Sequence, residues 1–197
     1  MSKQTPEPGS GHLRDEEFQP EILVSDTVFE GAVWDVRSDR FRYNDGEITR
    51  HYVDHPGAVA VVAIDDQDRV LLIQQYRHPI RHRDWELPAG LLDIEGEDVL
   101  VAAQRELAEE TDLAAEHWEP LLSTFTTPGG SDEVVHFFLA TGLSAAHSTH
   151  MRLDEEADIR AEWVPLADAV AAVLDGRMRN ALLVGGVLAA SLRRARA

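Results

Sequence analysis

The sequence predicts an α/β fold, an α/β/α sandwich with a mixed sheet, preceded by a small antiparallel β unit. Three features support this prediction: a turn signal at 44–46 between two strand-like segments, two apolar runs at 58–64 and 70–76, and an amphipathic pattern over 98–110. The apolar runs are typical of buried strands, and the amphipathic pattern is typical of a helix. Strands and helices mixed in this order favour a sandwich over an all-helical or all-strand domain.

The first 54 residues divide into two parts. Residues 1–18 are rich in Pro, Gly, Ser and charged side chains and lack an apolar period, so we expect a disordered tail. Residues 19–54 favour strands on both sides of Asn44-Asp45-Gly46, which is a signal for a tight hairpin turn. We therefore expect an N-terminal β unit over 19–54, and one larger domain over 55–197.

The elements of the larger domain follow from hydrophobic periodicity. The runs 58–64 and 70–76 flank the polar turn 65–68 and predict a hairpin of two buried strands. The helix over 98–110 has an apolar stripe on one side, as expected for a helix that packs on a core. The other predicted elements are strands at 134–140 and 159–166 and helices at 166–176 and 180–194.

Charge and composition exclude several classes of function. The chain has 36 acidic and 18 basic residues and a formal net charge of −18, so it should repel nucleic acid and anionic membranes. A local basic pocket for a small phosphate ester is compatible with this charge. The chain has no cysteine, which excludes disulfides, thiolate metal sites and a cysteine nucleophile. With no segment typical of a signal peptide or a membrane span, we expect a cytoplasmic protein.

Three glutamates crowd one face of the predicted helix. Glu106, Glu109 and Glu110 fall about one helical turn apart, where like charges repel by about 0.2–0.5 kcal/mol per exposed pair. Solvent alone could make such crowding tolerable. A divalent cation would turn it into an advantage, because hard cations such as Mg²⁺ take carboxylate oxygens as ligands.

The segment 90–113 resembles the Nudix box, G-x5-E-x7-R-E-U-x-E-E-x-G-U, where U is a bulky aliphatic residue. The register matches from Glu97 through Arg105-Glu106-Leu107 and Glu109-Glu110 to Leu113. The chain departs from the family pattern at two positions. Six residues, not five, separate Gly90 from Glu97, and Asp112 stands where the box has a glycine. Because aspartate tolerates the left-handed conformation better than most residues, we expect the helix cap to be kept.

The resemblance implies a fold, an activity and a cofactor. Enzymes with this box bind Mg²⁺ or Mn²⁺ and hydrolyse a nucleoside diphosphate linked to another group. By position, Glu106 and Glu110 would be the principal metal ligands, assisted by Glu109 and by the carbonyl of Ala89. Arg105 would orient the cluster by pairing with Glu97.

Two flanking segments resemble those of ADP-ribose pyrophosphatases, a subgroup of this family. The first, QQYRHPIRHRDWELPAG at 74–90, leads into the box, and the second, TTPGGSDE at 126–133, has a proline fifteen residues after Leu113. The resemblance implies that Arg77 binds a phosphate, for which its planar fork is suited; a surface salt bridge is the alternative. Trp85 is either an adenine platform or a packed core or dimer-contact aromatic. Other candidate substrate residues are Pro128, Gly129, Gly130 and Glu133, although the Pro-Gly-Gly sequence is also compatible with a simple turn.

The subgroup also implies a catalytic base outside the box and a dimer. A glutamate in a loop before a late strand positions the water in these enzymes, which points to Glu156 first and Glu155 second. The N-terminal β unit would build a domain-swapped homodimer. The expected reaction is Mg²⁺-dependent hydrolysis of ADP-ribose to AMP and ribose 5-phosphate. The alternatives are another sugar nucleotide or dinucleotide, or a non-catalytic ligand sensor, which the intact box acids disfavour.

Overall fold

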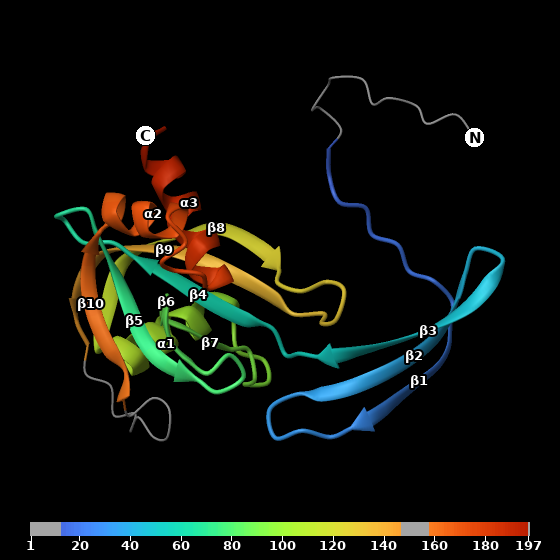
Figure 1. The fold of residues 1–197 in the computed structure, drawn as a ribbon. Coiled ribbons are helices and arrows are strands. Elements are labelled where there is room, and N and C mark those ends of the chain that lie inside the picture. Colours follow the sequence, from blue (N-terminus) through green and yellow to red (C-terminus); the bar gives the residue numbers. More distant parts are fainter. Residues whose placement is uncertain (1–12, 147–157, 197) are drawn as a thin grey trace.

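The N-terminal unit is a separate antiparallel sheet. The computed structural model describes residues 13–146 and 158–196, and its first three strands are β1 (Ile22–Phe29), β2 (Asp35–Tyr43) and β3 (Gly46–Asp54). They pair in the order β1-β2-β3. Asn44 opens the turn between β2 and β3 with φ +53°, as the hairpin signal predicts. Figure 1 shows this sheet beside the larger domain, with β3 leading into it. The predicted antiparallel unit is confirmed, while most of the predicted tail, residues 1–12, lies outside the described residues.

The larger domain combines helices with a mixed arrangement of strands, which confirms the predicted fold class. The predicted hairpin of 58–64 with 70–76 is wrong, because these two strands belong to different sheets and share one isolated bridge, between Ile64 and Val70. One sheet has the order β10-β5-β6 and the other β7-β4-β9-β8, in which β4 and β9 are parallel and the remaining neighbours antiparallel. The elements are β4 (Ala58–Ala63), β5 (Arg69–Arg77), β6 (His82–Glu86), β7 (Ala89–Leu91), α1 (Val99–Thr111), β8 (Leu113–Phe125), β9 (Val134–Ala145), β10 (Arg160–Pro165), α2 (Leu166–Leu174) and α3 (Ala181–Arg194).

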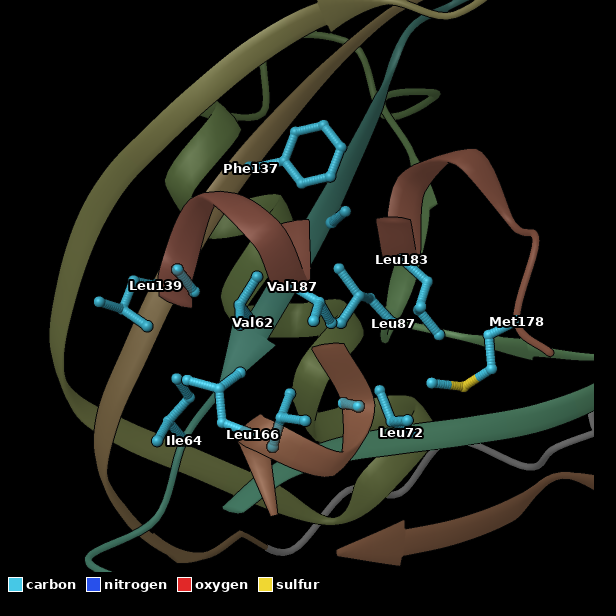
Figure 2. Packing of buried hydrophobic residues seen from close by; sticks show 14 of the residues in the cluster. Val62, Ile64, Leu72, Leu87, Phe137, Leu139, Leu166, Met178, Leu183 and Val187 are labelled. Carbon is cyan, nitrogen blue, oxygen red and sulfur yellow. The ribbon is translucent and has the colours of Figure 1, made fainter. Parts of the chain in front are cut away.

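The core has two halves because every residue of β4 is buried and successive side chains point to opposite faces. Val59 and Val61 pack with the buried side of α1. On the other face, Val62 packs with side chains from α2 and α3, as Figure 2 shows around Phe137 and Leu183. Full burial of one valine contributes about 1.5–3 kcal/mol to folding. The sheet that contains β4 is thus covered on both faces, and α1 packs against one of them.

Three strands were not predicted from the sequence. β8 is the longest of them, but its side chains alternate poorly and its pairing with β9 shifts register between Pro120 and Leu122. Because proline cannot donate a ladder hydrogen bond, it weakens any strand prediction based on local pattern. β6 and β7 contain five and three residues, too few for a period to appear. Within the described ranges, none of the helices is long and apolar enough to cross a membrane.

Candidate active site

Helix α1 is capped by an aspartate at each end. The Asp98 carboxylate accepts a hydrogen bond from the backbone N–H of Leu100 at 2.9 Å, which begins the helix. Asp112 ends it in the left-handed conformation, with φ +57° and its N–H donating to the carbonyl of Ala108. The expected cap is therefore confirmed despite the missing glycine. These two caps fix where α1 begins and where it ends.

The three glutamates of α1 face one pocket of about 330 Å³, called here the glutamate pocket. Its lining residues are Gln75, Arg77, Ala89, Gly90, Leu91, Asp93, Arg105, Glu106, Glu109 and Glu110. Glu110 is buried, and its carboxylate accepts a hydrogen bond from the N–H of Ala89 at 2.9 Å. The fold brings Ala89 and the three glutamates together, because Ala89 in β7 lies directly against α1.

Gly90 makes room for Glu106. A Cβ atom at position 90 would lie 2.0 Å from the Cδ of Glu106, well inside any permitted contact. Its φ is not in the left-handed region, so glycine is required here by space and not by backbone strain. The close approach places the Glu106 carboxylate directly against the backbone of β7.

Arg105 holds the acidic groups in place from within the same helix. It donates two hydrogen bonds to Glu97, at 3.0 and 2.9 Å, which confirms the predicted pairing. It also donates to Glu106 at 2.5 Å and to Glu109 at 3.3 Å. The hydrogen bond to Glu97 raises the pKa of Arg105 above its usual value, and the same contact lowers the pKa of Glu97. One guanidinium thus contacts three carboxylates and offsets part of their charge.

The donor chemistry of this pocket fits a hard divalent cation. Carboxylates from Glu106, Glu109 and Glu110 and the carbonyl of Ala89 are all oxygen donors, the type that Mg²⁺ and Mn²⁺ prefer. In the part of the chain that the structure describes, no group of three or more Asp, Glu, His or Cys side chains is arranged so that it could hold a metal ion. In this arrangement Arg105 lies 2.5 Å from a carboxylate oxygen of Glu106 and 3.3 Å from one of Glu109.

Strand β5 also lines the pocket, and a buried acid lies next to its arginine. Arg77, at the end of β5, lines the pocket and pairs with Glu86 in the neighbouring strand β6. Gln75 lines the same pocket. Glu86 was not predicted as a site residue, although it lies in the segment 74–90 that resembles the one leading into the box. Its contact with Arg77 depends on the pairing of β6 with β5, which the sequence pattern does not show.

Trp85 lies away from the glutamates. It lines a different pocket, of about 410 Å³, together with Leu72 and Met178, and it packs against the main hydrophobic cluster. Successive residues of a strand point to opposite faces, so Trp85 and Glu86 cannot both face the glutamate pocket. Of the two roles considered, the packed aromatic is the one that these contacts fit.

The loop 126–133 also lies apart from the glutamate pocket within this chain. Pro128, Gly129 and Gly130 line a pocket of about 650 Å³ that they share with aromatic residues of the N-terminal sheet. The carbonyl of Gly130 accepts a hydrogen bond from the N–H of Val53 at 2.9 Å. This part of the loop therefore joins the N-terminal sheet to the larger domain.

Glu133 ends the same loop in a small polar cluster. It accepts a hydrogen bond from the Thr126 hydroxyl, and its Oε1 lies 3.6 Å from the Nε2 of the partly buried His55. His55 in turn stacks on Trp34, with ring centroids 5.7 Å apart. In the described structure Glu133 contacts the protein, and a ribose contact remains a prediction. The two candidate bases, Glu155 and Glu156, lie outside the described residues.

Comparisons with known proteins identify the family. A model described as "NUDIX domain" matches residues 54–183. An ADP-ribose pyrophosphatase of Mycobacterium tuberculosis is 45% identical over 86% of this chain and 82% of its own length. A methanol dehydrogenase activator of Bacillus methanolicus is 34% identical over 85% of this chain and 90% of its own length. An ADP-ribose pyrophosphatase of Bacillus subtilis is 34% identical over 78% of this chain and 82% of its own length.

A solved structure agrees with the fold. The crystal structure of an ADP compounds hydrolase superposes with a TM-score of 0.74 at 23% identity, and the match covers 90% of this chain and 95% of that one. At this identity the likeness concerns the fold alone. The residues matched by the NUDIX model include β5, β7 and α1, the three elements that line the glutamate pocket. The chain is a member of the NUDIX domain family.

Proposed function

We propose that this protein hydrolyses the diphosphate bond of ADP-ribose to give AMP and ribose 5-phosphate, with Mg²⁺ or Mn²⁺ as cofactor. The observation that carries the proposal is the glutamate pocket, in which the box acids of α1 face an arginine of β5. The 45% identity to an ADP-ribose pyrophosphatase supports the choice of substrate.

The residues of the pocket have separate roles in this proposal. Glu106 and Glu110, assisted by Glu109 and the carbonyl of Ala89, hold the metal; when bound, it supplies positive charge to phosphoryl oxygens and lowers the pKa of a water. Arg105 limits the repulsion among the acids before the metal arrives. It also keeps their side chains in few conformations, because its fork contacts several of them at once.

Substrate and water are held by residues on other elements. Arg77, which lines the glutamate pocket from β5, binds a phosphoryl oxygen. Glu156, with Glu155 as the alternative, accepts a proton from the attacking water. The proposal also gives Pro128, Gly129, Gly130 and Glu133 a place beside the substrate, through the loop that contacts the N-terminal sheet.

The N-terminal β unit, residues 19–54, is proposed to form a domain-swapped homodimer in the cytoplasm. Several of its large apolar side chains are exposed in this chain, among them Phe29 at 64% and Val33 at 54%. Contiguous exposed apolar groups are typical of protein interfaces. Analytical ultracentrifugation should therefore give twice the mass of the 21.9 kDa chain. A fully active monomer would contradict the swapped arrangement.

The substrate is tested with a panel of nucleoside diphosphate compounds, each assayed with Mg²⁺ for kcat/KM. The proposal predicts the highest value for ADP-ribose and products identified as AMP and ribose 5-phosphate. A relative at 32% identity is a hydrolase of a CMP phosphonate, so the panel should include cytidine compounds. A clear preference for another member would replace ADP-ribose as substrate, and no turnover of any member would favour the sensor alternative.

A further inference from the structure

A buried carboxylate lies behind the arginine of the glutamate pocket. Glu86, the last residue of β6, is only 3% exposed. A charged group removed from water in this way must be paired and hydrogen-bonded to be tolerated. Its Oε1 and Oε2 accept hydrogen bonds from the Nε and Nη2 of Arg77 at 2.8 and 2.7 Å. The amide of Gln75 lies 3.4 Å from the same Oε2.

This contact fixes the direction of the guanidinium. Two parallel N–H to oxygen bonds hold both the plane and the rotation of an arginine fork, which a single contact does not. The Arg77 side chain is nevertheless 42% exposed and lines the glutamate pocket. Glu86 therefore holds the guanidinium of Arg77 from the protein interior, while Arg77 remains accessible from the pocket.

We propose that Glu86 is a positioning residue, which orients Arg77 to bind the diphosphate of the substrate. The inference rests on the proposed function, since it takes a phosphoryl oxygen as the anion that Arg77 binds. A long side chain that is already ordered loses less conformational entropy when its ligand arrives. Glu86 thus contributes to substrate affinity without touching the substrate.

Two possible roles of Glu86 predict opposite results. If Glu86 positions Arg77, removing its charge releases the fork and weakens substrate binding. If it merely neutralises Arg77, the same change leaves a more positive pocket, and an anionic substrate binds equally well or more tightly. The sign of the change in affinity therefore distinguishes the two roles.

The first experiment compares Glu86→Gln with the wild type in the full-length protein. We expect KM for ADP-ribose to rise about tenfold while kcat changes by less than about threefold, because the reacting groups on α1 are untouched. Glu119→Gln is the matched control, since Glu119 is an exposed acid whose carboxylate lies 3.7 Å from Arg193. It should change neither constant. A KM for Glu86→Gln that is unchanged or lower would overturn the proposal.

A double-mutant cycle tests whether Glu86 acts through Arg77. Arg77→Ala should raise KM, and adding Glu86→Gln should then change KM by less than about twofold, because no guanidinium remains to be oriented. The single variant Arg77→Ala leaves a buried charge without its partner, so its Tm should lie below that of the double variant. Effects on KM that simply multiply would show that the two residues act independently and would contradict positioning.

A binding measurement separates this inference from the proposed activity. The Kd of ADP-ribose is measured by calorimetry in EDTA, where hydrolysis does not occur. The proteins compared are the wild type, Glu86→Gln, Arg77→Ala and the double variant. Positioning is supported if Glu86→Gln and Arg77→Ala each raise the Kd and the double variant raises it little further than Arg77→Ala alone. This holds even if another compound proves to be the better substrate. If the wild type binds ADP-ribose and Glu86→Gln binds it equally well, the positioning role is wrong whatever the turnover assays give.

Discussion

Gly90→Ala is a small change that should strongly affect activity. The added Cβ would lie 2.0 Å from the Cδ of Glu106 and 2.2 and 2.3 Å from its two oxygens. Because nonbonded carbon atoms stay about 3.5–4.0 Å apart, the carboxyl group must move away by about 1.5 Å. That displacement breaks the 2.5 Å hydrogen bond from Arg105 and shifts a proposed metal ligand.

The expected cost falls on catalysis and much less on folding. A misplacement of about 1 Å in a catalytic array can lower the rate by about 10²-fold, so we expect kcat to fall by at least that factor. The clash involves the end of a flexible side chain, and the free energy of unfolding should therefore change by less than about 1 kcal/mol. Steady-state hydrolysis of ADP-ribose and thermal unfolding measure the two quantities on the same sample.

Gly185→Ala is the matched control. A Cβ atom at position 185, in α3, would meet only the ring of Phe137 at 3.9 Å, an ordinary contact. Alanine is favoured over glycine inside a helix by about 0.5–1 kcal/mol, so this variant should be slightly more stable and equally active. If Gly90→Ala keeps a wild-type kcat, the close contact between position 90 and Glu106 has no bearing on catalysis and the reasoning fails.

Three further predictions concern other parts of the chain. Burial raises the pKa of Asp65, but hydrogen bonds from Arg69 and from backbone N–H groups outweigh it and lower the pKa overall. Its stabilising effect is therefore full above the unfolded pKa of about 3.9 and is lost as pH falls through the lower folded value. Asp65→Asn should cost about 1–2 kcal/mol at pH 7, and its Tm should approach that of the wild type towards pH 3; a constant gap would contradict this. His55→Ala removes the stacking on Trp34 and should lower stability by about 1–2 kcal/mol, seen as a lower Tm and faster proteolysis near the N-terminal sheet. Glu156→Gln should slow kcat at least about tenfold, and a near-normal rate would move the base role to Glu155 or Asp158.

Much of the candidate site could be predicted because its residues are close in sequence. Helical spacing alone places Glu106, Glu109 and Glu110 on one face, and the structure has them in one pocket. The cap at Asp112 was also predictable, since only a few residue types adopt the left-handed conformation readily. Both predictions depend on local geometry, which sequence patterns describe well.

Residues defined by tertiary contacts could not be placed in the same way. The side on which Trp85 and Glu86 lie depends on the pairing of β6 with β5, and five residues show no clear period. The strand β8 was missed because Pro120 and a shift in register obscure its pattern. The loop 126–133 resembles a substrate loop in sequence, yet its hydrogen bond to Val53 joins it to the N-terminal sheet. Partners distant in the chain decided each of these outcomes.

The central claim is that the α1 glutamates support metal-dependent hydrolysis. It is tested most directly by the initial rate of AMP release from ADP-ribose as Mg²⁺ is titrated, for the wild type and Glu110→Gln. Glu110 is buried and bonded to the N–H of Ala89, so the isosteric amide should leave the fold intact. The account predicts saturable activation by Mg²⁺ in the wild type and no measurable metal-dependent release in the folded variant. An equal rate in both proteins, or a wild-type rate that EDTA does not reduce, would contradict it.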